Sequence, residues 1–270
     1  MKTYAIIDKV SAAKPIGFLF CFEKSGNFII ELQKGLDEWE APLLFQGFIR
    51  DGVYTIPQDV SLLWVKERII PSGRQNIGLI LKNANLTEYN ELRLLDLSKG
   101  KCSQDDCYLK EIAFENIDPE IKGRMKQTVK ECFTVNKQTI LCLFKDNTVK
   151  KISLKKLQTH CPEISKILNN DILFHSVKVG PGGYSIDFGG VVSIPVTILR
   201  SAANEEPVLA EDFYFFVKNN IINTTAACEI LECSRQNLAY LASAKKLEPI
   251  VNGFKENLYT KGEINLASAD

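Results

Sequence analysis

The chain has 270 residues, of which 45% are hydrophobic and 24% charged, a composition typical of an ordered globular protein. Lysine plus arginine and aspartate plus glutamate number 33 each, so the net charge indicates neither a nucleic acid, nor an acidic substrate, nor a membrane surface as partner. No stretch reaches the roughly 20 apolar residues of a membrane helix, and the N-terminus has no long apolar run before a cleavage site. We expect a cytoplasmic protein of two or three domains, with no membrane partner.

The first domain is expected over residues 1–117 and has a mixed α+β pattern. Two β-rich runs in residues 16–32 flank the turn sequence around Gly26 and predict an antiparallel hairpin. A helical turn is expected at residues 62–67, with Asp59 as a candidate N-cap. Apolar residues at helical spacing then predict two helices that separate at residues 83–85. The charged segment that follows, with Pro119 and Gly123, is interpreted as a connection, and nothing in the pattern indicates a role for this domain.

A second, smaller α+β module is expected over residues 130–203. Apolar and polar residues alternate on both sides of Asp146 and Asn147, which predicts a hairpin. A short helical segment follows, and strands then flank a glycine-rich turn at residues 180–183. The residues of the hairpin expected to face inward are Leu141, Leu143, Val149 and Ile152.

This order of elements resembles the DUF2442 domain, a small bacterial α+β module. The resemblance covers roughly residues 134–200. Most of its hallmark positions are packing or turn residues, so it implies a fold and supplies no catalytic residue. Those positions are Phe144, Asp146, Leu154, Leu168, Phe174, Val177, Val179, Gly183, Ile186, Phe188 and Gly190.

Basic residues are in excess from residue 118 to residue 160, where lysine and arginine outnumber acidic residues by six. If these side chains share a face, that face attracts phosphates in a salt-dependent way. A solvated surface with the lysines spread around the module is an equally weighted alternative. The candidate phosphate contacts are Lys145, Lys150, Lys151, Lys155 and Lys156.

The third domain is expected over residues 208–270 and contains two short helical runs. Asn223 and Ser234 each precede one of these runs and are candidate N-caps. Two short helices joined by a turn near residues 232–233 form a helix-turn-helix arrangement. Cys228 is expected where the helix backbones approach each other, and Cys233 where the turn directs a side chain inward, so their spacing requires no metal.

Residues 222–264 resemble the winged helix-turn-helix of excisionase and MerR-type proteins. In that family the second helix enters the major groove and the hairpin after it, the wing, contacts the DNA backbone. The resemblance implies that Arg235, Gln236, Asn237 and Tyr240 face DNA, with Lys255 on the wing. The turn position that the family usually fills with glycine is Glu232. The matching positions are Asn223, Ala227, Leu231, Ser234, Arg235, Gln236, Leu238, Leu241, Leu247, Pro249, Gly253 and Tyr259.

Catalytic and metal-binding patterns are not indicated. The eight cysteines and two histidines give no set of four converging ligands. Cys21, Cys132 and Cys142 lie inside apolar runs, where a thiol behaves as a small hydrophobic group. The sequence contains no evident nucleophile–base pair, and the glycine-rich turn lacks the ending of a phosphate-binding loop. We therefore expect no enzymatic activity, no cofactor and no metal.

Two functions remain open. The first is a DNA-binding protein, a bacterial transcriptional regulator that reads DNA with the second helix of the third domain. Residues 223–264 carry balanced charge, so useful DNA binding requires a homodimer or the basic middle module. The second is a non-enzymatic adaptor in which the helix-turn-helix docks a protein partner.

Overall fold

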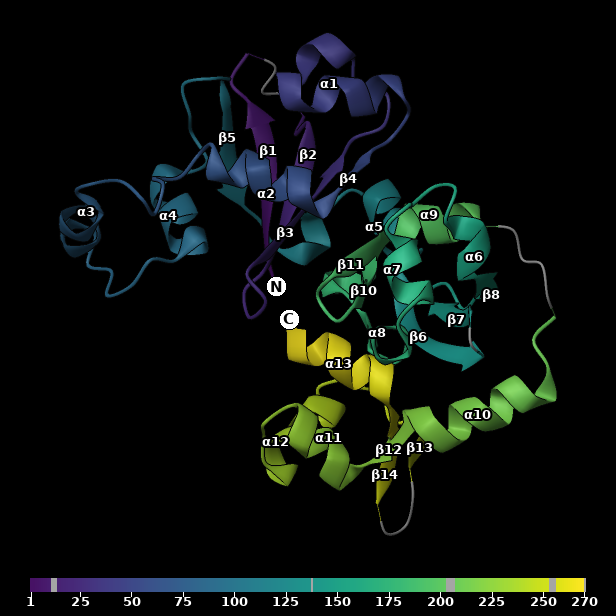
Figure 1. Ribbon diagram of the computed structural model, residues 1–270. Helices are drawn as coiled ribbons and strands as arrows, with labels where there is room; N and C mark the ends of the chain where they lie inside the picture. Colours follow the sequence, from purple (N-terminus) through teal and green to yellow (C-terminus); the bar gives the residue numbers. More distant parts are fainter. Residues whose placement is uncertain (11–13, 137, 203–206, 253–255, 270) are drawn as a thin grey trace. The chain divides into compact units, whose positions relative to one another are not determined.

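The computed structural model describes residues 1–10, 14–136, 138–202, 207–252 and 256–269 (Figure 1). The chain divides into two compact units, Met1–Lys122 and Gly123–Asp270. Both combine helices with antiparallel sheets, so the predicted α+β class is confirmed. Among the described residues, no helix has the length and apolar character required to cross a membrane.

The first unit is built on a five-stranded antiparallel sheet with the order β4-β3-β2-β1-β5. The predicted hairpin is confirmed, because the second and third strands pair antiparallel and Gly26 in their turn has φ +65°, a conformation that favours glycine. The second strand, GFLFCF, is buried along its whole length, as expected for a run without polar side chains. The strands are β1 (Lys2–Asp8), β2 (Gly17–Phe22), β3 (Asn27–Leu32), β4 (Thr55–Ile56) and β5 (Cys107–Glu111).

Helices bury the apolar side chains of this sheet. The rings of Phe45 and Trp64 stack with their centroids 6.0 Å apart, and both side chains are fully buried. The α-helices are α1 (Leu43–Arg50), α2 (Gln58–Lys66), α3 (Ile77–Asn83), α4 (Glu91–Ser98) and α5 (Pro119–Met125), and the 3-10 helices are η1 (Glu38–Glu40) and η2 (Phe114–Asn116).

Two expectations for the first 125 residues are wrong. Helix α2 begins one turn before the predicted position, with Pro57 rather than Asp59 at the N-cap, because proline tolerates the start of a helix. The segment interpreted as a connection contains α5, whose Ile121 side chain is fully buried. The break between α3 and α4 is present, and Asn85 in it has φ +56°.

The second unit begins with two three-stranded sheets, β6-β7-β8 and β11-β10-β9. The hairpin at Asp146 and Asn147 is confirmed, and Asn147 has φ +65° in its turn. Leu141 and Ile152 are buried as expected, but Val149 is 38% exposed because it begins its strand beside the turn. The elements are β6 (Val129–Asn136), β7 (Thr139–Phe144), β8 (Val149–Ser153), α6 (Leu154–Leu157), α7 (Ile164–Leu168), α8 (Asp171–His175), β9 (Val177–Val179), η3 (Pro181–Gly183), β10 (Ser185–Phe188), β11 (Val192–Pro195) and α9 (Val196–Ser201).

The C-terminal part of the second unit contains the predicted pair of short helices and a third sheet, β12-β14-β13. Its small core has Ala227, Leu238, Leu247, Tyr259 and Ile264 as buried members. The elements are α10 (Ala210–Asn220), β12 (Ile221–Asn223), α11 (Thr224–Ile230), α12 (Arg235–Ser243), β13 (Val251–Asn252), β14 (Asn257–Thr260) and α13 (Lys261–Ala269).

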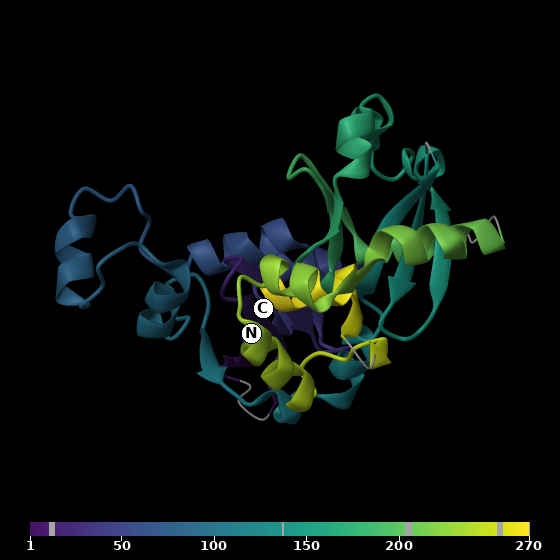
Figure 2. The same ribbon diagram turned by 90° about the horizontal axis from the view of Figure 1, so that it is seen from below.

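Buried contacts join this C-terminal part to the β6-β7-β8 sheet. The Gly262 amide in α13 donates a hydrogen bond to Glu131 Oε1 in β6 (3.1 Å), and α13 lies against β6 and β9 (Figure 2). The Lys151 ammonium pairs with Asp212 in α10 at 2.9 Å, and both side chains are at most 5% exposed. The segments expected as two domains, at residues 130–203 and 208–270, therefore share one contact-dense unit.

Candidate nucleic-acid interface

Each of the two short helices is capped where the sequence predicts. The Asn223 side chain accepts a hydrogen bond from the Ala226 amide at 2.9 Å, and Ser234 Oγ accepts one from the Asn237 amide at 3.2 Å. Such caps satisfy amide groups that otherwise have no partner in the first turn of a helix. The side chains of Asn223 and Ser234 therefore fix the residues at which α11 and α12 begin.

The turn between the helices is a Schellman motif, a helix end closed by one left-handed residue. The Cys233 amide donates to the Cys228 carbonyl at 3.0 Å, and the Glu232 amide donates to the Glu229 carbonyl at 3.3 Å. Glu232 has φ +50°, so it adopts the conformation for which glycine is usual at this position.

The spacing of the two cysteines follows from this motif. Cys228 and Cys233 stand at the two positions whose side chains usually meet in a Schellman motif, and both pack against the small core. Both are free thiols, and desolvation and the neighbouring Cys233 raise the pKa of Cys228. The five-residue separation is thus that of a helix end. Among the described residues no cluster of three or more metal-ligating side chains occurs.

Helix α12 presents its polar side chains to solvent while Leu238 is buried below them. The four residues predicted to face DNA are all exposed, and Tyr240 is 61% exposed. The exposed face also contains Ala239 and Ser243, small residues that the sequence did not indicate as part of the interface. The face therefore combines long polar side chains with small ones. The four predicted residues are Arg235, Gln236, Asn237 and Tyr240.

Arg235 is oriented by a contact that sequence reasoning missed. Its Nη2 donates a hydrogen bond to Thr225 Oγ1 in α11 at 2.8 Å, across the turn. Thr225 and Arg235 are ten residues apart, and only the Schellman turn brings them together, so no local sequence signal could have identified the pair. The guanidinium keeps its other donors available at the exposed end of α12.

The wing is only partly described. Strands β13 and β14 pair antiparallel, with Val251 opposite Leu258 and Asn252 opposite Asn257. Tyr259 in β14 is buried in the core below the hairpin, and Thr224 Oγ1 donates to the Asn257 carbonyl at 3.2 Å. Lys255, the predicted wing contact, lies outside the described residues.

The five lysines predicted to contact phosphates do not behave alike. Lys155 and Lys156 are exposed at the end of α6, and Lys145 is exposed although its ammonium donates to the Gly182 carbonyl at 2.7 Å. The Lys150 ammonium donates to the Arg200 and Ala202 carbonyls, and burial lowers its pKa.

The prediction that Lys151 contacts phosphate is wrong. Its side chain is only 5% exposed and its ammonium is committed to Asp212. The alternation of side chains along β8 directs Lys151 toward the first turn of α10, and a count of charges in the sequence cannot reveal this direction. A buried, ion-paired ammonium cannot reach a phosphate, so Lys151 is removed from the set.

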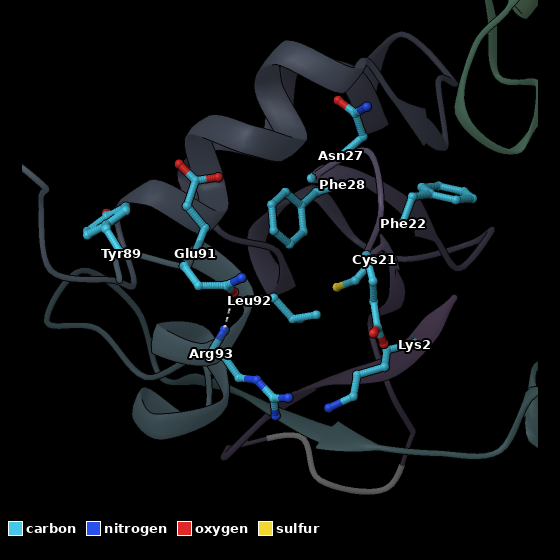
Figure 3. Close-up of a pocket in the computed structure, with 12 residues that line it drawn as sticks. Lys2, Cys21, Phe22, Asn27, Phe28, Tyr89, Glu91, Leu92 and Arg93 are labelled. Atoms are coloured by element: carbon cyan, nitrogen blue, oxygen red, sulfur yellow. Dashed lines mark hydrogen bonds between the residues drawn. The ribbon is translucent and has the colours of Figure 1, made fainter. Parts of the chain in front are cut away.

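A separate pocket of about 320 Å³ lies in the first unit, between the β2–β3 hairpin and the start of α4 (Figure 3). Lys2 and Arg93 extend along one end of it and Asn27 lies at the other. The Lys2 ammonium is paired with Asp96 at 3.1 Å, and burial raises the pKa of the Cys21 thiol far above its usual range. The thiolate form of Cys21 is therefore disfavoured, and the pocket wall mixes both charge signs.

Comparison with family models, with curated proteins and with solved structures finds no match to this chain. The resemblances to the DUF2442 domain and to the excisionase and MerR-type winged helix therefore stay predictions.

Proposed function

We propose that this chain binds DNA with the exposed face of α12 and acts as a bacterial transcriptional regulator. The observation that carries the proposal is the exposed face of α12, where the long side chains of Arg235, Gln236 and Tyr240 share the surface with the small residues Ala239 and Ser243. A helix with this composition fits the major groove, because small residues permit close approach and long polar side chains reach base edges.

Arg235 is the residue to which we assign base reading. Its guanidinium stands in the first turn of α12, the part of a recognition helix that contacts bases. Thr225 holds the guanidinium by one hydrogen bond, which limits the conformational freedom that binding must remove. Two parallel hydrogen bonds to the O6 and N7 atoms of a guanine are the contact for which a guanidinium is best suited.

The charge distribution supports site-specific contacts more than strong non-specific attraction. Glu229 and Glu232 are exposed on α11 and its turn, beside Arg235. Three exposed residues of the middle module remain candidate phosphate contacts, namely Lys145, Lys155 and Lys156. Because phosphate neutralisation supplies most non-specific affinity, a single copy is expected to bind DNA weakly.

Selection from a pool of random-sequence duplexes tests the proposal. The full chain should enrich one short motif, and a Gln236→Ala, Tyr240→Ala double variant should lose that enrichment because it removes long side chains from the reading face. An exposed substitution away from α12, Lys166→Ala, serves as the control and should keep the motif. If the intact chain enriches no sequence at low salt, the DNA proposal is wrong.

The phosphate contacts are tested by salt titration. Lys155→Gln with Lys156→Gln should weaken binding to all sequences alike and reduce the slope of log affinity against log salt by about 2, since each phosphate contact contributes about 1. An unchanged slope would remove these two lysines from the interface while leaving the assignment of α12 intact.

A further inference from the structure

Among the described residues, helix α10 packs against the rest of the second unit through Asp212, Phe216 and Asn220. Asp212 is buried and paired with Lys151, and Asn220, the last residue of the helix, is also buried. The Phe216 ring lies 5.2 Å from the Phe133 ring of β6, between centroids. Residues 212, 216 and 220 are four apart, so they form a single anchoring stripe.

Beside this anchoring stripe, α10 exposes large apolar side chains. Phe213 is 60% exposed, Tyr214 69% and Val217 44%, and together with exposed Ala210 they occupy helical positions i, i+3, i+4 and i+7. We call these four residues the apolar stripe. Side chains of this size are expensive to leave in water, and a contiguous exposed group of them marks an interaction surface.

Two opposite charges flank the apolar stripe on one side. Glu211 and Lys218 are exposed and seven residues apart, which places them on the same side of the helix about 10 Å from each other. At that separation they cannot pair with each other. Among the residues that the structure describes, neither has an ion pair or a side-chain hydrogen bond.

We propose that the apolar stripe binds the apolar stripe of a second copy of this chain, with the two α10 helices antiparallel. A two-fold axis through the middle of an antiparallel pair brings Glu211 of each copy beside Lys218 of the other, on the same side of the seam. A parallel pair brings neither of these opposite charges together. The positions of the two charges therefore select a second copy in the antiparallel arrangement, and the contact is self-complementary and closed.

The contact is expected to be weak. Two half-buried aromatic rings and the adjoining aliphatic groups bury on the order of 400 Å² per copy, roughly half of what a stable interface uses. We therefore expect a dissociation constant in the micromolar range. The interface rests on α10 alone and does not depend on DNA binding, although it would give each complex two α12 helices.

Sedimentation equilibrium of the full chain without DNA tests this contact. The chain should shift from monomer to dimer with rising concentration, and Phe213→Asp should raise the dissociation constant at least about tenfold, which corresponds to losing one strong interface residue. Leu79→Asp is the matched control, because Leu79 is an equally exposed apolar residue of α3, and it should leave dimerisation unchanged. Circular dichroism spectra should show that both variants keep the native helix content.

A charge exchange tests the antiparallel arrangement. Lys218→Glu alone should raise the dissociation constant several-fold, because two attractive pairs become repulsive, and adding Glu211→Lys should restore it. Lys166→Glu makes the same charge change away from α10 and should have no effect. A wild-type chain that stays monomeric at every concentration, or a dimer indifferent to Phe213→Asp, overturns the proposal, and a double exchange that fails to restore binding overturns the antiparallel pairing. Because no DNA is present, failure here leaves the DNA proposal standing.

Discussion

The carboxyl group of Glu131, in the second unit, is poorly solvated. Glu131 is 2% exposed, its Oε1 accepts from the Gly262 amide, and its Oε2 has no hydrogen-bond partner among the described residues. Burial raises the pKa of Glu131 to about 7, while the Gly262 and Thr260 hydrogen bonds and Lys130 act against the rise and Glu263 adds to it. The ionised form is therefore costly in the folded chain.

The raised pKa of Glu131 makes the free energy of unfolding depend on pH. Between the unfolded pKa near 4.5 and the folded pKa of about 7, the folded state binds more protons than the unfolded chain, so the free energy of unfolding falls as pH rises. Glu131→Gln should remove this dependence and stabilise the chain above pH 7 by about 2–3 kcal/mol. Urea unfolding from pH 5 to pH 8 measures it, with the exposed Glu163→Gln as control. A Glu131→Gln chain that keeps the wild-type slope would show that the carboxyl does not titrate in this window.

At the level of single elements, the turn between α11 and α12 stores a small strain. Glu232 occupies a left-handed conformation, which costs a residue with a side chain about 1 kcal/mol relative to glycine. Glu232→Gly should therefore raise the free energy of unfolding by about that amount. The same substitution three residues earlier, Glu229→Gly, should lower it by about 1 kcal/mol, because that residue is helical. Equal signs for the two substitutions in thermal unfolding would contradict the Schellman assignment.

The elements that sequence predicts best are those defined by local chemistry. The hairpins around Gly26 and Asn147 and the caps at Asn223 and Ser234 depend on residues next to one another in the chain, and all four are confirmed. Contacts between distant segments leave no comparable local signal. The sequence therefore missed the burial of Lys151 against α10, the Thr225–Arg235 bond and the burial of Ile121 in α5.

At the scale of the second unit, the middle module and the C-terminal part share a buried ion pair. Lys151 and Asp212 are both nearly inaccessible, and Asp212 also accepts a hydrogen bond from the Leu209 amide at 2.8 Å. Lys151→Met should lower the free energy of unfolding by about 3–5 kcal/mol, because it leaves Asp212 buried without its partner. Lys151→Met with Asp212→Leu should cost less than Lys151→Met alone, since no unpaired charge remains. Chemical unfolding followed by circular dichroism gives both values, and a double variant that loses as much stability as Lys151→Met alone would contradict this account of the pair.

Fluorescence anisotropy shows whether α12 reads base sequence through Arg235. Binding of the wild type, Arg235→Ala and Lys246→Ala to the selected duplex and to duplexes with single base changes would be measured at several salt concentrations. Arg235→Ala should weaken binding to the preferred duplex by about 1–3 kcal/mol and lose discrimination at one base pair. Lys246→Ala removes the same charge from an exposed residue beyond the end of α12, and it should keep the preference. If Arg235→Ala keeps the wild-type preference at every base pair, Arg235 does not read bases and the account of α12 is contradicted.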